Sequence, residues 1–133
     1  MKLFFDSSVL IAACMSPQGV SRAFFQKPKR PWELITCSYC AHEVQRNLTR
    51  LRPSALADWT SISGAMTIVP DALTMPYPLL FWAHKDKPVL CSALVESADV
   101  LLTWDRGDFG HLLGGRVYGT LVQTPAEFLR TLT

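Results

Sequence analysis

The chain has 133 residues, of which 49% are hydrophobic, and its 13 Lys and Arg residues face 11 Asp and Glu residues. This length and composition predict one domain over residues 1–133 that folds without disulfides, and a net charge of +2 does not indicate nucleic-acid binding by itself. The longest early apolar run, residues 9–15, is too short to cross a membrane, and four cysteines are too few for a disulfide scaffold. We therefore expect no membrane span and a cytoplasmic location.

The first quarter of the chain predicts a strand followed by two helical pieces. Residues 2–5 form a short apolar run typical of a buried strand. Asp6 and the two serines after it are preferred helix caps, so a helix is expected to follow and to end before Pro17. A second helical piece at 20–26 leads into a basic loop at 27–31.

The middle of the chain repeats this order. A strand at 34–37 precedes a helix from 38 to about 51, whose apolar residues recur every four positions. Another helix at 54–62 precedes a strand at 66–69. Several prolines prevent a prediction for residues 70–84.

The last third predicts two more strands and two or three helices. Asp86 opens a helix with an apolar face, and residues 100–103 predict the next strand. The glycine-containing stretch 105–115 suits a loop or a short helix, and 116–122 predicts a final strand. A capping-box pattern at 124–127 then begins the last helix.

Strands that alternate with helices predict parallel βαβ units. The strand segments are uniformly apolar, as expected for strands covered by helices on both faces. We therefore predict an α/β fold, a three-layer α/β/α sandwich with a central parallel sheet.

This architecture sorts the acidic residues, because ligands bind at the carboxyl ends of parallel strands. Asp6 directly follows the first predicted strand, and Asp105 follows the fourth. Asp99 precedes that fourth strand and is excluded, since it lies at the opposite edge. Glu43 and Asp86 lie on predicted helices. Glu43 could instead be a solvated helix residue, and Asp86 could be only a helix cap, so spacing alone does not single out either one.

Four segments, which are spread over nearly the whole chain, carry a family resemblance: LFFDSSVLIAA, SYCAHEVQRNL, KDKPVLCSALVESADVLLTWDRGDF and TPAEFLRTL. They resemble the PIN-domain family of nucleases, which includes VapC-like toxins of bacterial toxin–antitoxin pairs. The family pattern has an acid after the first strand, a helical Glu, an Asp opening a later helix and an Asp after the next strand. It maps onto Asp6, Glu43, Asp86 and Asp105. Ser8 departs from the pattern, in which Asn is frequent.

The resemblance implies a PIN-like parallel sheet, a requirement for Mg²⁺ or Mn²⁺, and hydrolysis of RNA phosphodiester bonds. It also implies frequent homodimers and, for a toxin, an antitoxin protein as partner. The chemistry agrees, since oxygen ligands select hard cations, and a pair of such ions can activate water and stabilise a leaving oxygen.

The predicted site residues have different roles. Asp6 and Asp105 are expected to be direct metal ligands, while Glu43 and Asp86 hold a second ion or orient water, and Asp108 is a further candidate ligand. Supporting hydrogen bonds are expected from Ser8 and Thr103. The candidate contacts to RNA phosphates are Lys29, Arg30 and Arg46.

Four other functions are open from the sequence. A catalytically inactive PIN-like module would bind RNA or protein and lack a tight metal site. A phosphoacceptor receiver domain would use Asp71 after the third strand, but Asp6 lacks the acidic neighbour it needs. The Cys37-x-x-Cys40 motif also fits a redox or zinc site, although the positions of both cysteines favour buried thiols. Nucleotide-binding enzymes are disfavoured because no glycine-rich loop follows the first strand.

Overall fold

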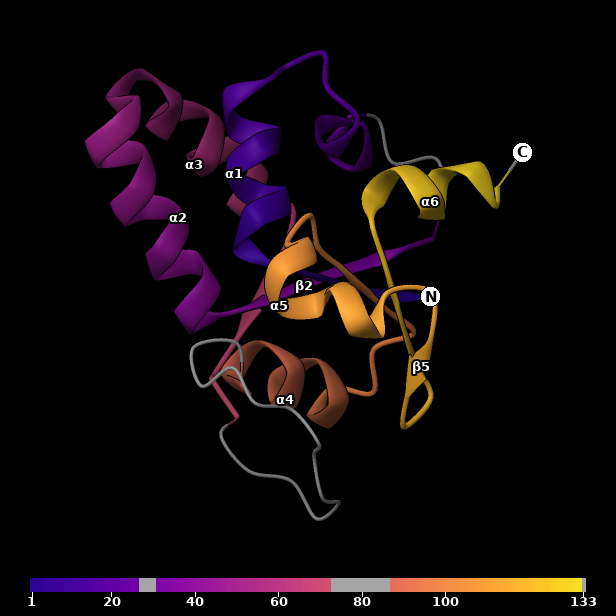
Figure 1. The fold of residues 1–133 in the computed structure, drawn as a ribbon. Helices are drawn as coiled ribbons and strands as arrows, with labels where there is room; N and C mark the ends of the chain where they lie inside the picture. Colours follow the sequence, from indigo (N-terminus) through magenta and orange to yellow (C-terminus); the bar gives the residue numbers. More distant parts are fainter. Residues whose placement is uncertain (27–30, 73–86, 133) are drawn as a thin grey trace.

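A six-stranded sheet lies at the centre of the molecule (Figure 1), in a computed structural model that describes residues 1–26, 31–72 and 87–132. The strand order is β3-β2-β1-β4-β6-β5. All neighbouring strands pair in parallel except β5 and β6. The strands are β1 (Lys2–Phe5), β2 (Glu33–Cys37), β3 (Thr67–Val69), β4 (Val100–Leu102), β5 (Arg116–Val117) and β6 (Thr120–Gln123).

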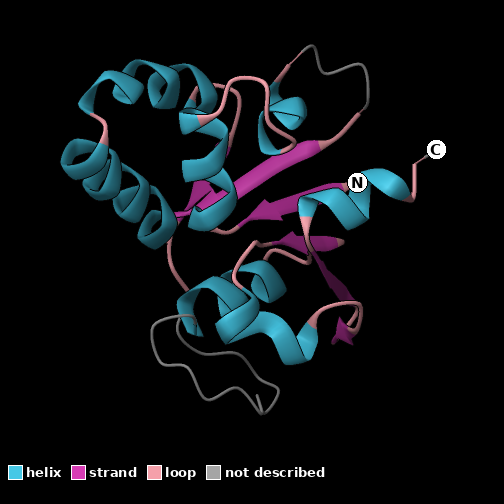
Figure 2. Ribbon diagram, turned by 45° about the horizontal axis from the view of Figure 1, so that its top comes forward, coloured by secondary structure: helices cyan, strands magenta, loops and turns pink. Residues whose placement is uncertain are grey.

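Helices cover both faces of the sheet, as Figure 2 shows. The α-helices are α1 (Ser7–Met15), α2 (Ser38–Leu51), α3 (Leu56–Ser63), α4 (Lys87–Val95), α5 (Arg106–Phe109) and α6 (Pro125–Arg130). Short 3-10 helices are η1 (Ser21–Phe25), η2 (Pro53–Ala55) and η4 (Gly110–Leu112). The predicted three-layer α/β/α sandwich is therefore confirmed. In the described part of the chain, no helix has the length and apolarity needed to span a membrane.

Two apolar clusters hold the three layers together, because successive strand residues point to opposite faces. Leu3 and Phe5 pack in the cluster that contains α1, α2, α3 and α6. Phe4 packs in the other cluster, with α4 and α5. None of these three side chains is exposed to solvent. The apolar side chains of β1 therefore pack on both faces of the sheet, as its sequence indicates.

The prediction of one continuous strand over residues 116–122 was wrong. The chain reverses at Tyr118 and Gly119, whose φ angles are 47° and 92°. Two positive φ angles in a row give the tight turn that joins antiparallel strands. The structure therefore has a β5–β6 hairpin, and β5 is an antiparallel strand at the edge of an otherwise parallel sheet.

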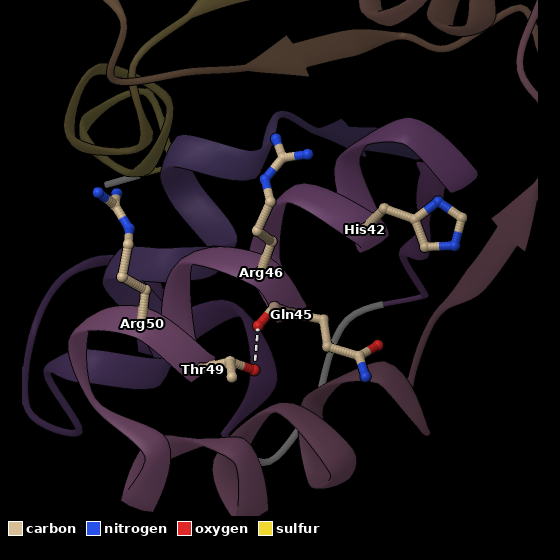
Figure 3. Close-up of a pocket in the computed structure, with 5 residues that line it drawn as sticks. All are labelled: His42, Gln45, Arg46, Thr49 and Arg50. Atoms are coloured by element: carbon tan, nitrogen blue, oxygen red, sulfur yellow. Dashed lines mark hydrogen bonds between the residues drawn. The ribbon is translucent and has the colours of Figure 1, made fainter.

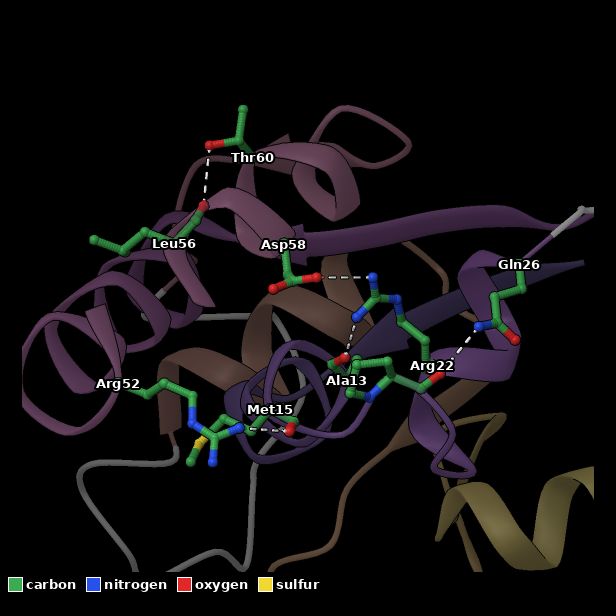
Figure 4. Close-up of polar contacts among 9 residues, drawn as sticks. Ala13, Met15, Arg22, Gln26, Arg52, Leu56, Asp58 and Thr60 are labelled. Atoms are coloured by element: carbon green, nitrogen blue, oxygen red, sulfur yellow. Dashed lines mark hydrogen bonds and ion pairs between the residues drawn. The ribbon is translucent and has the colours of Figure 1, made fainter. Parts of the chain in front are cut away.

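Two arginines secure the end of α1 (Figure 4). Arg22 donates to the carbonyl oxygen of Ala13 at 2.8 Å and forms an ion pair with Asp58 of α3 at 3.0 Å. Arg52 donates to the carbonyl oxygen of Met15 at 3.1 Å. These contacts satisfy carbonyl groups that have no partner inside the helix. They hold α1 against its neighbours, and this also fixes the start of α1 at the edge of the sheet.

Candidate active site

The candidate site lies where the order of strands reverses. From β1 the chain runs outward to β2 and β3, whereas β4, on the other side of β1, is followed by β6. In open α/β sheets, ligands bind at such a switch point, beyond the carboxyl ends of the strands. Asp6 follows β1 and Asp105 lies three residues after Leu102, the last residue of β4. The structure thus places these two acids at the ends of neighbouring strands.

Asp6 caps α1, and its carboxylate accepts three hydrogen bonds. Its Oδ1 accepts from the backbone N–H of Ser7 at 2.8 Å. Its Oδ2 accepts from the hydroxyls of Ser8 at 2.8 Å and Thr103 at 2.7 Å. A carboxylate offers about four lone-pair positions, so one position remains for another partner. The side chain is buried, with 4% of the residue exposed.

In the part of the chain that the structure describes, no positive charge balances that of Asp6. Burial raises the pKa of its carboxyl group, and the negative charge of Glu43 raises it further. Hydrogen bonds from Thr103, Ser8 and Ser7 lower the pKa but do not cancel these effects. No Lys or Arg side chain in the described residues forms an ion pair with Asp6. A cation bound at this position would supply the missing charge.

Glu43 reaches this region from the second turn of α2. The hydroxyl of Ser7 donates to its Oε1 at 3.0 Å, and Arg46 Nη2 lies 3.9 Å from its Oε2. The side chain is 26% exposed, so it is accessible to a ligand. The packing of α1 against α2 therefore brings Glu43 close to Asp6, although 37 positions separate them in the sequence.

Asp105 caps α5, and its Oδ1 accepts from the backbone N–H of Asp108 at 2.9 Å. Its own backbone N–H donates to Thr103 Oγ1 at 3.0 Å. The Thr103 hydroxyl therefore touches Asp105 through the backbone and Asp6 through its carboxylate. Ser8 makes a parallel link, since its hydroxyl donates to Asp6 and accepts from the backbone N–H of Trp104 at 3.0 Å.

These contacts join Asp6, Glu43 and Asp105 into one hydroxyl-linked group. In residues 1–26, 31–72 and 87–132, however, no three His, Cys, Asp or Glu side chains are grouped closely enough to hold a metal ion. Asp86, the fourth predicted ligand, and the predicted RNA contacts Lys29 and Arg30 lie outside the described residues. The metal-binding role of the acids and of the half-buried Asp108 therefore stays a prediction.

Two side chains near the site are not among the predicted site residues. Ser7 links α1 to Glu43, and only its position next to Asp6 could have drawn attention to it. Trp104 precedes Asp105, and its ring N–H donates to the Ser21 hydroxyl at 2.7 Å. That bond ties the loop after β4 to η1, so it fixes the approach to Asp105.

A basic depression of about 600 Å³ lies on the exposed side of α2 (Figure 3). It is lined by His42, Gln45, Arg46, Thr49 and Arg50. These positions recur at intervals of three and four residues, so they share one side of the helix. Arg46 connects this depression with the candidate active site, because it lines the depression and also lies near Glu43. The position of Arg46 suits its predicted role as a phosphate contact.

The fold matches solved structures of VapC toxins. VapBC2 from Rickettsia felis, solved bound to a DNA fragment from its promoter, has a TM-score of 0.67 at 9% identity, covering 93% of this chain and 98% of that one. VapBC-1 from nontypeable Haemophilus influenzae has a TM-score of 0.62 at 12% identity, covering 95% and 99%. VapC20 from Mycobacterium tuberculosis, a sarcin-ricin loop cleaving toxin, has a TM-score of 0.59 at 16% identity, covering 87% and 97%. No family model and no curated protein matches the sequence.

These likenesses cover nearly the whole chain and define its class, an α/β protein with a PIN-like fold. More particularly, the fold is that of the VapC toxins. At these identities the likeness shows the shared fold, which is the one that the sequence resemblance implied.

Proposed function

We propose that this chain is a divalent-metal-dependent endoribonuclease that hydrolyses RNA phosphodiester bonds. The observation that carries the proposal is the buried Asp6 carboxylate, which lies at the switch point of the sheet and close to Glu43. No Lys or Arg side chain among residues 1–26, 31–72 and 87–132 forms an ion pair with it. The fold supports the same activity, since VapC20 is a toxin that cleaves the sarcin-ricin loop.

The donor chemistry of the site suits Mg²⁺ or Mn²⁺. Asp6, Glu43 and Asp105 offer carboxylate oxygens, and Asp6 retains an unused lone-pair position. Oxygen donors without thiolate or imidazole favour these hard cations over zinc. We propose that Asp86 and Asp108 complete the ligand set. A divalent ion held there would activate water for attack on phosphorus and stabilise the leaving oxygen.

The residues around the acids hold them in place. The hydroxyls of Ser8 and Thr103 fix the orientation of the Asp6 carboxylate, and the hydroxyl of Ser7 fixes that of Glu43. Such outer contacts keep ligands in their binding geometry before the ion arrives. Asp105 is oriented by its capping hydrogen bond at the start of α5.

An RNA cleavage assay tests the proposal directly. A structured RNA incubated with the purified chain should be cut in the presence of Mn²⁺ or Mg²⁺ and left intact after addition of a chelator. Cleavage that persists in excess chelator would contradict metal dependence. Calorimetric titration with Mg²⁺ and Mn²⁺ distinguishes the nuclease from a catalytically inactive PIN-like module. The inactive module should show no tight metal site.

The basic depression on α2 makes a separate prediction about RNA affinity. Replacing Arg46 with Gln should weaken binding of single-stranded RNA in chelator, where no cleavage occurs. The slope of log affinity against log salt concentration should become less steep by about 0.7, because one phosphate contact is lost. Arg116→Gln is the matched control, since Arg116 is exposed on the edge strand β5. Equal slopes for the two variants would exclude Arg46 from RNA binding.

The comparisons also support a protein partner. Two of the matched structures are VapBC assemblies, which pair a toxin with its antitoxin. We propose that this chain likewise binds an antitoxin that controls its activity, and that it forms the homodimer implied by the sequence resemblance. Co-expression with the gene product encoded next to it, followed by size-exclusion chromatography with light scattering, tests both proposals.

A further inference from the structure

Two cysteine thiols face each other beside the candidate active site. Cys37 is the last residue of β2 and the residue that precedes α2, and Cys40 lies in the first turn of that helix. Their Sγ atoms are 3.7 Å apart and share a hydrogen bond. Both residues are buried, with 0% of their surface exposed. Neither thiol has a role in the nuclease chemistry proposed above.

The separation of the two sulfur atoms is suited to a disulfide bond. A disulfide needs the sulfur atoms to approach to ~2.05 Å, with the two Cα atoms ~4.4–6.8 Å apart. Residues three positions apart at the start of a helix lie on the same side of it. The remaining gap can therefore close by rotation of the side chains with a small adjustment of the first turn of α2.

The two thiols are also chemically unequal, as an attacking and a resolving thiol must be. The hydrogen bond with Cys40 lowers the pKa of Cys37, whereas burial and the nearby Asp71 carboxylate oppose this effect. The same hydrogen bond, together with burial, raises the pKa of Cys40. The positive end of the α2 dipole further favours a thiolate at Cys37.

The other cysteines provide an internal contrast. Burial raises the pKa of Cys14 to about 11 and also raises that of Cys91. Neither of them shares a hydrogen bond with a second thiol in the described residues. The pair of Cys37 and Cys40 is therefore the position at which an oxidant can join two thiols within the chain.

We propose that Cys37 and Cys40 form a redox-active dithiol that hydrogen peroxide oxidises to an intramolecular disulfide. The Cys37 thiolate attacks one peroxide oxygen, the O–O bond breaks, and the departing hydroxide takes up a proton to become water. Cys37 is then a sulfenic acid. The Cys40 sulfur attacks the Cys37 sulfur, the S–O bond breaks, and the second oxygen leaves as water with the Cys40 proton. Two thiols lose two electrons, and one peroxide becomes two waters.

Peroxide is the oxidant that fits this location. It is little larger than water, so it can enter a buried site through small fluctuations of the protein, whereas a bulky disulfide reagent cannot. Zinc is a poorer explanation of the pair, because in the described residues no third His, Cys, Asp or Glu side chain completes a metal-binding group. A structural zinc site needs four ligands.

Oxidation of this pair would change the contacts of residues in the candidate active site. The parallel pairing of β1 with β2 ends at Phe4 and Ile35, two positions before Asp6 and Cys37, and the charge of Asp6 acts on the Cys40 thiol. Cys40 precedes Glu43 by one helical turn on α2. A disulfide that adjusts the first turn of α2 should disturb the contact between Ser7 and Glu43. This consequence, unlike the oxidation itself, rests on the proposed function.

Mass spectrometry of the full chain tests the dithiol without any enzymatic assay. The reduced protein is treated with graded amounts of hydrogen peroxide, denatured with excess iodoacetamide and digested with trypsin. Cys37 and Cys40 fall on one peptide, residues 30–46, while Cys14 and Cys91 fall on peptides 3–22 and 86–106. Peptide 30–46 should lose two hydrogen atoms and resist alkylation until it is reduced, while the other two stay alkylated.

Two single variants test the order of the steps. In Cys40→Ser, Cys37 should accumulate as a sulfenic acid that dimedone captures, because the resolving thiol is absent. In Cys37→Ser, Cys40 should remain a thiol at the same dose. The wild-type measurement suffices if a variant fails to fold. Equal oxidation of all four cysteines, cross-links between chains, or zinc bound to the purified protein would each overturn the proposal.

An activity measurement tests the effect of the disulfide on cleavage separately from the formation of the disulfide. The oxidised chain should cleave RNA several-fold more slowly than the reduced chain, with recovery after dithiothreitol, and the Cys37→Ser/Cys40→Ser double variant should be insensitive to peroxide. Equal rates for the oxidised and reduced chains would refute the coupling to the site. Absence of cleavage in both forms would contradict the proposed function and leave the disulfide result standing.

Discussion

Replacing Asp6 with Asn should abolish metal-dependent RNA cleavage and raise the melting temperature of the metal-free protein. The rate should fall by more than about 100-fold, because even outer contacts of a metal site are worth about 10–100-fold in affinity or activity. The gain in stability has a different origin. The folded protein must bury the Asp6 charge, and no Lys or Arg in the described part of the chain forms an ion pair with it. Asn removes that charge while keeping a good helix cap.

The pH dependence of the melting temperature identifies the cause. Burial raises the pKa of Asp6 in the folded protein, so ionisation of this group costs folding free energy. The contribution of protonated Asp6 to stability is therefore complete below the unfolded pKa of about 3.9 and lost as the pH rises through the folded value. The Asn variant should show its advantage near pH 7 and lose it below about pH 4.

Calorimetry of the wild type and the variant in chelator measures this difference. A gain of about 1 kcal/mol corresponds to roughly 3–5 °C for a chain of this length. Glu33→Gln is the control for the loss of one negative charge, since Glu33 is exposed at the start of β2, at the opposite edge of the sheet. A lower metal-free melting temperature for the Asp6 variant would mean that hydrogen bonding outweighs the buried charge.

The fold could be predicted because local signals and burial agreed along most of the chain. The helical stripe of Cys40, Val44 and Leu48 is buried as its spacing indicated. The capping box also formed as predicted, with Thr124 accepting from the Glu127 N–H at 3.2 Å and Glu127 accepting from the Thr124 N–H at 3.0 Å. Patterns of this kind depend on residues a few positions apart, which a sequence displays directly.

The features that were missed depend on conformation or on packing between distant segments. Tyrosine is rarely found at positive φ, so Tyr118 gave no sign of the hairpin turn. The placement of Asp6 and Asp105 at one edge of the sheet followed from their positions after predicted strands, but spacing alone could not place Glu43 near them. That contact needs α1 to pack on α2 and the Ser7 hydroxyl to bridge them. In the same way, the motif of Cys37 and Cys40 was visible, but the approach of their sulfur atoms was not.

The second large effect is expected at Thr103, whose hydroxyl is the direct link between two of the acids. It is fully buried, donates to Asp6 Oδ2 at 2.7 Å and accepts from the Asp105 N–H at 3.0 Å. Thr103→Val keeps the shape of the side chain but leaves that N–H without its partner and removes one donor from Asp6. The free energy of unfolding should fall by about 1–3 kcal/mol.

The same substitution should weaken metal-dependent cleavage by about 10–100-fold, mainly through a higher Mn²⁺ concentration at half-maximal rate. Thr103→Ser should restore cleavage, because it returns the hydroxyl and removes only a methyl group. Thr120→Val is the matched control, since the buried Thr120 hydroxyl donates to the Ala98 carbonyl at 2.7 Å, at the other end of the sheet. If both valine variants lose stability while cleavage by the Thr103 variant is unchanged at every Mn²⁺ concentration, Thr103 has only a structural role. A shift in the Mn²⁺ dependence confined to the Thr103 variant assigns its hydroxyl to the orientation of the Asp6 carboxylate.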